Sequence, residues 1–327
     1  GKSKGLEIES GRIVLSGLDQ YDQFADIDLQ IKGGLSDKLA YLDNEPFKYT
    51  SALNLELSHA AGHADTRLKL FFILEKSLRF DQVKVWARSR LRDVTLGNIF
   101  LGRGIDGGQL DVRVDSRGMD VNGEVRVADI PARLSWRENF TKGGNFRSKY
   151  KLHAKIPDVR HVRDIGLDMD PFSGNYIRGG VTSDITYTVF PGHDRRLEVK
   201  ADITEAALSA PAFGWSKPIG VAGSAEVVVD LEDQLVTDIP RFTLKAADLD
   251  IQGKAKYALD GTGLERVDFA RIAYGRTRME GALIPKTDGG WEAGFRGPSF
   301  DLSPLWQEVM ADNTGTEADH PLLDKLT

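Results

Sequence analysis

Residues 110–127 read LDVRVDSRGMDVNGEVRV, and this stretch decides the fold that we expect. Leucine and valine alternate with aspartate and arginine through residues 110–114, and the alternation resumes after a turn at residues 116–118. Successive side chains of a β-strand point to opposite faces of the sheet. The stretch therefore predicts a β-hairpin with one apolar face and one charged face.

The same period-two pattern recurs along most of the chain. It is found in residues 24–31, 53–57, 67–74, 78–93, 181–190, 197–203, 225–231, 242–246, 249–259, 267–273, 277–283 and 291–295. Asp106-Gly107-Gly108, Asp260-Gly261 and Asp288-Gly289-Gly290 have the composition of turns between strands. Short helices are expected only at residues 36–42, 157–167 and 302–310. We predict a mainly β protein.

Bulk composition excludes several classes of protein. The 327 residues are 41% apolar and 28% charged, with a net charge of −6, which is an ordinary globular balance. Acids and bases are mixed along the whole chain, and this argues against a nucleic-acid partner, which needs a basic stripe. The chain has no cysteine, so disulfides and thiolate chemistry are excluded. No apolar segment approaches the roughly 20 residues that span a bilayer. The longest apolar cluster, residues 68–74, contains Phe71-Phe72-Ile73-Leu74 and is expected to be covered on both faces.

No catalytic or metal-binding pattern is found. His59 and His63 have the spacing of two metal ligands on a helix, but they follow a strand pattern and lack a third ligand. We interpret them as part of a polar turn. The acid pairs Asp168/Asp170 and Asp248/Asp250 are interpreted as solvated strand residues. We expect no enzyme activity, no metal and no cofactor.

Two β modules are expected, at residues 1–145 with the helix at 36–42 and at residues 146–310 with the other two helices. The glycines of Gly143-Gly144-Asn145 interrupt the strand pattern at this boundary. Residues 311–327 are expected to be a polar linker, and both ends look like cuts in a longer chain.

The order of these strands resembles that of the YhdP-type, AsmA-like proteins of Gram-negative bacteria. The resemblance rests on residues 78–85, on residues 110–140, and on the pattern from 267–271 through 275–277 and 288–291 to 297–306. It covers the chain from about Leu6 to Trp306. Each motif is only a turn-and-strand pattern, so the order and spacing carry the likeness.

The resemblance implies a periplasmic segment of a protein anchored in the inner membrane. It also implies an extended, curved antiparallel sheet, a repeating taco-like β-groove, that conducts phospholipids between the inner and outer membranes. The expected partners are phospholipid acyl chains, and both membranes through other parts of the parent chain. We expect apolar residues of successive strands to line the groove, namely Leu110, Val112, Val114, Val121, Val125, Val199, Val227, Leu244, Ile251 and Phe269.

Three alternatives remain open from the sequence. A closed sandwich also buries one face of each alternating strand, so alternation does not require a groove. A scaffold or assembly factor for envelope proteins would bind a partner chain along a similar groove. A carbohydrate or glycolipid binder would use aromatic platforms, which the dispersed tryptophans do not favour.

Overall fold

The computed structural model describes residues 2–3, 6–42, 56–75, 77–78, 82–100, 103–141, 143–159, 176–210, 215–233, 235–258, 263–286, 289–301 and 303. The chain divides into two compact units. Unit 1 comprises residues 1–154 and 188–191, and unit 2 comprises residues 155–187 and 192–327. The predicted module boundary at 145/146 stays a prediction.

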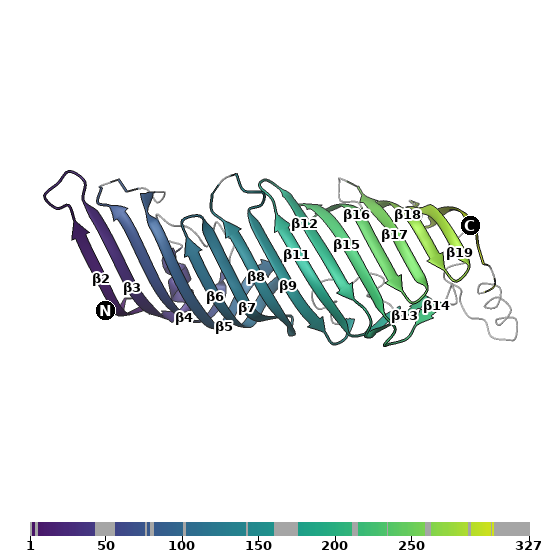
Figure 1. Ribbon diagram of the computed structural model, residues 1–327, viewed down its shortest axis with the longest axis horizontal. Coiled ribbons are helices and arrows are strands. Elements are labelled where there is room, and N and C mark those ends of the chain that lie inside the picture. The colour runs from purple at the N-terminus through teal and green to yellow at the C-terminus, as the bar shows by residue number, and fades with distance from the viewer. Residues whose placement is uncertain are drawn as a thin grey trace. The chain divides into compact units, whose positions relative to one another are not determined.

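Unit 1 is an antiparallel meander in which each strand from β2 to β9 pairs with the next along the chain (Figure 1). A two-residue strand, β1, pairs with β2. The elements are β1 (Lys2–Ser3), β2 (Leu6–Ser16), β3 (Phe24–Gly34), α1 (Leu35–Leu42), β4 (Glu56–Ile73), β5 (Lys84–Phe100), β6 (Arg103–Asp115), β7 (Gly118–Val127), β8 (Ile130–Asn139) and β9 (Ser148–Ile156).

Unit 2 contains a second meander, in which β12 pairs with β15 and each strand from β15 to β20 pairs with the next. A small sheet pairs β10, β13 and β14. The strands are β10 (Ile177–Gly179), β11 (Val181–Val189), β12 (Asp194–Asp202), β13 (Ala206–Ala210), β14 (Trp215–Lys217), β15 (Gly223–Glu232), β16 (Leu235–Ala246), β17 (Leu249–Tyr257), β18 (Leu264–Tyr274), β19 (Thr277–Pro285) and β20 (Trp291–Ser299). The protein is thus mainly β and antiparallel with almost no helix, as predicted.

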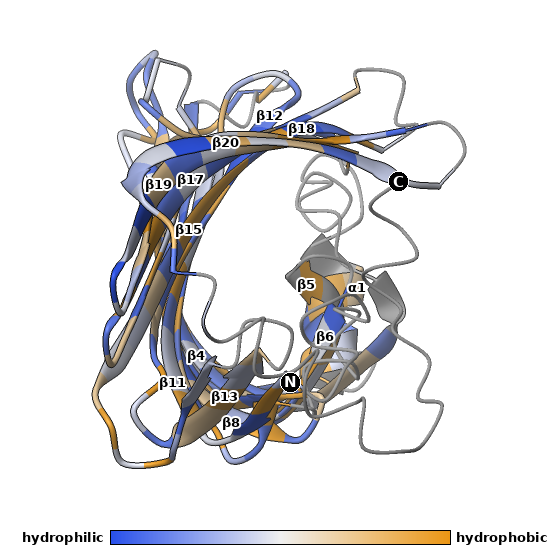
Figure 2. Ribbon diagram, turned by 90° about the vertical axis from the view of Figure 1, so that its right-hand side faces the viewer, coloured by the Kyte–Doolittle hydropathy of each residue, from blue (hydrophilic) through white to orange (hydrophobic). Residues whose placement is uncertain are grey.

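The alternation of apolar and polar residues in the sequence places them on opposite faces of the sheet. In β8 every second residue from Ile130 to Glu138 is buried, and the residues between them are exposed or half-buried. β9 has the same pattern. Figure 2, coloured by hydropathy, shows apolar and polar residues alternating along the strands.

The helix predicted at 36–42 is confirmed as α1. The predicted helices at 157–167 and 302–310 lie almost wholly outside the described residues.

Three other predictions were wrong in detail. His59 and His63 lie in the first half of β4 rather than in a turn, so about 13 Å of extended chain separates them. Asp106-Gly107-Gly108 lies inside β6, where Gly107 has a φ of 59° and the register with β7 shifts by a bulge. Glycine with positive φ is common in bulges as well as in turns. This is why the glycines of this motif were wrongly predicted to form a turn. The strand predicted at 78–93 is β5, which begins at Lys84 and continues to Phe100.

The apolar cluster at residues 71–74 is not covered on both faces. Phe71 is 40% exposed, because it points to the charged face of the sheet. There it stacks on Phe24, with ring centroids 5.5 Å apart, and Lys84 Nζ lies 5.6 Å from its ring.

A buried lysine holds the small sheet in place. Lys217 is 1% exposed, and its Nζ donates to the backbone carbonyls of Ile203 at 2.9 Å and Ala206 at 2.5 Å. These hydrogen bonds satisfy a cation that would otherwise be costly to bury.

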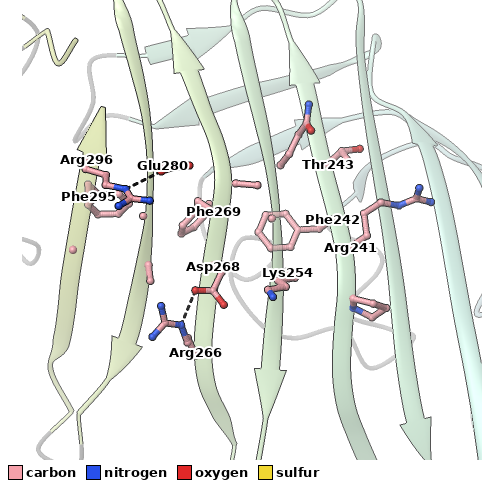
Figure 3. A pocket seen from close by; sticks show the side chains of 17 residues that line it. Arg241, Phe242, Thr243, Lys254, Arg266, Asp268, Phe269, Glu280, Phe295 and Arg296 are labelled. Carbon is pink, nitrogen blue, oxygen red and sulfur yellow. Dashed lines mark hydrogen bonds and ion pairs between the residues drawn. The ribbon is translucent and has the colours of Figure 1, made fainter. Parts of the chain in front are cut away.

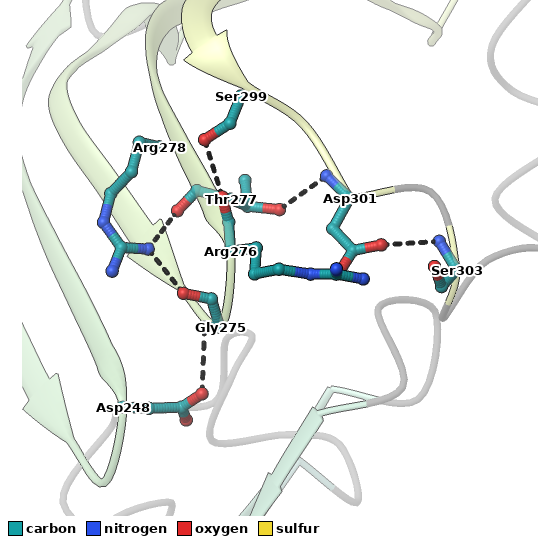
Figure 4. A network of polar contacts seen from close by, with 8 residues as sticks. All are labelled: Asp248, Gly275, Arg276, Thr277, Arg278, Ser299, Asp301 and Ser303. Atoms are coloured by element: carbon teal, nitrogen blue, oxygen red, sulfur yellow. Dashed lines mark hydrogen bonds and ion pairs between the residues drawn. The ribbon is translucent and has the colours of Figure 1, made fainter.

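A polar network fixes the turn between β18 and β19 and the end of β20 (Figure 4). Asp248 accepts hydrogen bonds from Gly275 N at 2.9 Å and from Trp215 Nε1 at 3.0 Å. Asp301 accepts from Ser303 N and from Arg276 Nε, both at 3.0 Å. The bonds from Ser303, and then from Arg276, lower the pKa of Asp301 to about 2.

We expect Asp301 to stabilise unit 2 in a pH-dependent way. Its pKa is lower in the folded than in the unfolded protein, so its contribution is present above the ordinary pKa of 3.8 and is lost as the pH falls through about 2. Asp301→Asn should lower the midpoint of thermal unfolding at about pH 6, and the difference from wild type should shrink towards about pH 2. An equal difference at both pH values would contradict this assignment.

A row of alternating phenylalanine and glycine crosses five strands of unit 2. Phe242, Gly253, Phe269, Gly281 and Phe295 are direct cross-strand neighbours. A Cβ on Gly253 would lie 2.5 Å from Phe242 Cζ, so the ring occupies the space that glycine leaves free. The rings of Phe242 and Phe269 meet edge to face with centroids 5.8 Å apart.

Gly281→Ala should destabilise unit 2 by about 1–3 kcal/mol, because the new Cβ would overlap the Gly294 carbonyl and the Phe295 ring. Gly294→Ala is the matched control in the neighbouring strand, because nothing lies within 4 Å of its added Cβ. Thermal unfolding of both variants measures the effect, and equal stability would show that the glycine row is not required.

Candidate functional site: an apolar face on each sheet

Unit 1 has an apolar face formed by rows of cross-strand neighbours. Val112, Val121, Trp136 and Tyr150 lie side by side on β6 to β9. The rings of Trp136 and Tyr150 stack with centroids 5.1 Å apart. In an adjacent row Leu110, Gly123, Leu134 and Leu152 follow the same strands.

The five residues predicted for unit 1 are all on this face. Leu110, Val121 and Val125 are 4%, 3% and 3% exposed, respectively. Val112 and Val114 are half-buried. The structure therefore brings these five side chains together on one face.

The larger side chains of the unit 1 face were missed. Trp136, Tyr150, Leu134 and Leu152 are each at most 8% exposed. Their strands, β8 and β9, carry the same alternation as residues 110–127, so the period-two signal was sufficient to find them.

The five residues predicted for unit 2 also share one face. Val199 and Val227 are direct neighbours, and Val227 lies opposite Phe242 at the start of the phenylalanine–glycine row, which contains Phe269. Leu244 and Ile251 are neighbours in the next row. All five predicted residues are half-buried, so the unit 2 face is more open to solvent than that of unit 1.

A shallow pocket of about 660 Å³ lies on β16–β20 around the phenylalanine–glycine row. Figure 3 shows its aromatic and charged residues, including the ion pairs Arg266–Asp268 at 2.6 Å and Arg296–Glu280 at 2.8 Å. Its lining therefore combines aromatic carbon with charged side chains, of which these two pairs are neutralised.

Helix α1 places one lysine against the apolar face of unit 1. Lys38 Nζ donates to the Ile31 and Ala64 carbonyls at 2.8 and 2.7 Å and to Thr66 Oγ1 at 3.0 Å. Thr66 in turn bonds Ser89, with 2.7 Å between their hydroxyl oxygens. Burial lowers the pKa of Lys38 to about 8, and the negative charge of Asp65 opposes this shift.

Lys38→Met should destabilise unit 1 by about 1–3 kcal/mol, because it removes three hydrogen bonds that dock α1 on β3 and β4. The matched control is Lys32→Met, which removes only an exposed ion pair to Glu9 and should cost less stability than Lys38→Met. Chemical unfolding of the two variants compares them. Equal losses would show that Lys38 does not anchor the helix.

Glu138 is the acidic exception on the apolar face. It is 5% exposed and accepts a hydrogen bond from Trp136 Nε1 at 3.2 Å. Burial raises its pKa, which is opposed by hydrogen bonds from Ser148 and Trp136. The Glu138 carboxyl is therefore hydrogen-bonded by Trp136 and Ser148, and it fixes the position of the indole.

The candidate chemical groups of the sequence are not brought together. Asp248 bonds Gly275 and Trp215, whereas Asp250 forms an ion pair with Arg271 at 2.8 Å. Asp168 and Asp170 lie outside the described residues. Within the described ranges, no three His, Cys, Asp or Glu side chains are arranged to hold a metal ion. Over the same part of the chain, no helix combines the length and apolarity needed to cross a membrane.

Comparisons of this chain with models of protein families, with curated proteins and with solved structures find no match.

Proposed function

We propose that this chain is a periplasmic segment of a YhdP-type, AsmA-like protein that conducts phospholipids along an apolar groove. The parent protein is anchored in the inner membrane, and the cargo passes between the inner and outer membranes. The observation that carries the proposal is the apolar face on each sheet, on which successive strands place apolar side chains in register.

Such a face meets the main physical demand on a lipid conduit. Burial of each methylene contributes about 0.8 kcal/mol, so a 16-carbon chain left in water costs roughly 13 kcal/mol. A conduit therefore needs apolar contact from strand to strand, with charge kept on the other face. The half-buried residues of unit 2 leave apolar surface available for such contact.

The bulges support the proposed curvature of each sheet. In unit 1, register shifts accompany Gly62, Asp93 and Gly107 on three successive strands, all with positive φ. In unit 2, one extra residue interrupts the register of β16, β18 and β20 in turn. Bulges bend strands and increase their twist, so repeated bulges favour a curved, groove-like sheet.

Val112→Asp and Ile251→Arg should each lower the amount of phospholipid that copurifies with the protein by about tenfold or more. An unpaired charge beside an acyl chain costs several kcal/mol. Mass spectrometry of extracts from the purified chain measures the bound lipid.

Matched controls add similar charges to the opposite face. Asn122→Asp, next to Val121 on β7, and Val228→Arg, next to Val227 on β15, should leave bound lipid unchanged. Circular dichroism establishes that all four variants are folded. Full lipid content in the folded Val112→Asp and Ile251→Arg proteins would overturn the proposal.

A scaffold that binds a partner polypeptide is the second candidate, because β20 has an open edge to which another strand can pair. Every residue of β20 is exposed, and in the described part of the chain β20 pairs only with β19. Open edges accept added strands. Photocrosslinkers at positions 112 and 251 on the apolar faces and at position 294 on β20 separate the candidates. Capture of lipid at 112 and 251 favours the conduit, and capture of peptide alone, including at 294, favours the scaffold.

A further inference from the structure

The charged face of β5 carries cations without acids. Its outward side chains from the start of the strand are Lys84, Trp86, Arg88, Arg90 and Arg92, and all are exposed. The intervening residues Val85, Ala87, Ser89 and Leu91 belong to the apolar face. The neighbouring strands carry acids as well, since Asp65 of β4 and Asp111 of β6 lie opposite Arg90. Only the outward row of β5 itself lacks an acidic side chain.

Arginines lie directly opposite one another across three strands. Arg67 of β4 faces Arg88 of β5, and Arg88 faces Arg113 of β6. Directly opposed like charges destabilise a sheet. Arg67 is neutralised by Asp28 at 2.9 Å. The arrangement therefore carries a cost in stability that an anionic partner would offset.

Unit 2 shows that the fold does not require unpaired arginines. On its charged face Arg196 pairs with Asp230 at 2.6 Å and Arg271 pairs with Asp250 at 2.8 Å. By contrast, among the residues the structure describes, Arg88, Arg92 and Arg113 have no acidic side chain within ion-pair distance. The positive charge of unit 1 is therefore available to a partner.

Exposed aromatic rings lie among these cations. Trp86 is 40% exposed, and Lys69 Nζ and Arg88 Cζ lie 6.0 and 5.7 Å from its ring. Phe71, also 40% exposed, is the direct neighbour of Lys84. Tryptophan beside lysine and arginine is typical of surfaces that lie at the lipid headgroup level of a membrane.

We propose that the charged face of β4–β6 docks onto a bilayer surface that contains anionic phospholipid. Guanidinium groups bind phosphate in a bidentate manner, and the two rings would enter the headgroup region beside them. The choice of lipid over an acidic polypeptide rests on the proposed function, since a lipid carrier must meet a membrane. The site itself is distinct from the apolar face, because alternate residues of the same strands form the two faces.

The test compares sedimentation of the purified chain with vesicles of phosphatidylcholine alone and with vesicles that also contain phosphatidylglycerol. Binding should require phosphatidylglycerol and should weaken as salt is raised. Each unit of charge at a membrane surface changes affinity by about fivefold, and the double variant Arg88→Glu/Arg92→Glu changes the charge by four units. It should therefore bind about 100-fold or more weakly. Trp86 fluorescence should shift to the blue when wild type binds, although the other four tryptophans contribute to the baseline.

The matched control is Arg196→Glu/Arg271→Glu, which makes the same change of net charge on the ion-paired face of unit 2. It alters no basic residue at the docking surface, so vesicle binding should stay within about twofold of wild type. Arg88→Gln should unfold at the same temperature as wild type or higher, because it relieves the repulsion from Arg67 and Arg113. This variant keeps the test informative if the double variant does not fold.

Three results would overturn the docking proposal: equal binding to both vesicles, unchanged binding of the folded Arg88→Glu/Arg92→Glu protein, or preference for polyglutamate over vesicles. The last would assign the face to an acidic protein. Copurified lipid, measured on the same variants, separates the two proposals. A variant that loses vesicle binding but keeps its copurified lipid is altered only in docking by the charged face. If no lipid copurifies with the protein, the result counts only against lipid conduction by the apolar face.

Discussion

Cross-strand register is the constraint on which the rest of the structure depends. A strand side chain has a period of two, so a slip of one residue would exchange the apolar and charged faces of a strand. In unit 1 the pairs Val112–Val121, Val121–Trp136 and Trp136–Tyr150 keep four strands in phase. Where an extra residue enters, as at Gly107, a bulge absorbs it and the faces beyond remain aligned. Because the meander preserves phase, each sheet has two chemically different surfaces.

The two surfaces suit different partners. The apolar face of unit 1 is filled by large side chains such as Trp136 and Leu134, and it also holds α1 through Lys38. The apolar face of unit 2 is half-buried and has rings resting over glycines. The charged faces differ as well, since arginines are paired with acids in unit 2 and are opposed to one another in β4–β6. A protein that handles lipid could use the first kind of surface for acyl chains and the second for headgroups.

Much of the fold and of the candidate site followed from local pattern. Alternation in residues 110–127 predicted the hairpin β6–β7, and the same signal placed Val199, Leu244 and Ile251 on one face of unit 2. The strand bounds were less predictable, because glycine marks a bulge at Gly62 and Gly107 as readily as a turn. Phe71 was expected to be covered, since its local sequence is apolar on both sides, yet only the neighbouring strands decide which face is open.

The sequence by itself determined that the protein is mainly β, that most strands have one apolar side and one polar side, and that cysteine chemistry is absent. These properties are local, because period and composition do not depend on which strands become neighbours. Only the tertiary structure decided that Phe242, Phe269 and Phe295 align over two glycines, and that Arg67, Arg88 and Arg113 face one another. Both arrangements arise from cross-strand pairing between residues that are distant in the chain. The order of charged and aromatic residues along the sequence does not show either row, because both depend on which strands pair and in which register.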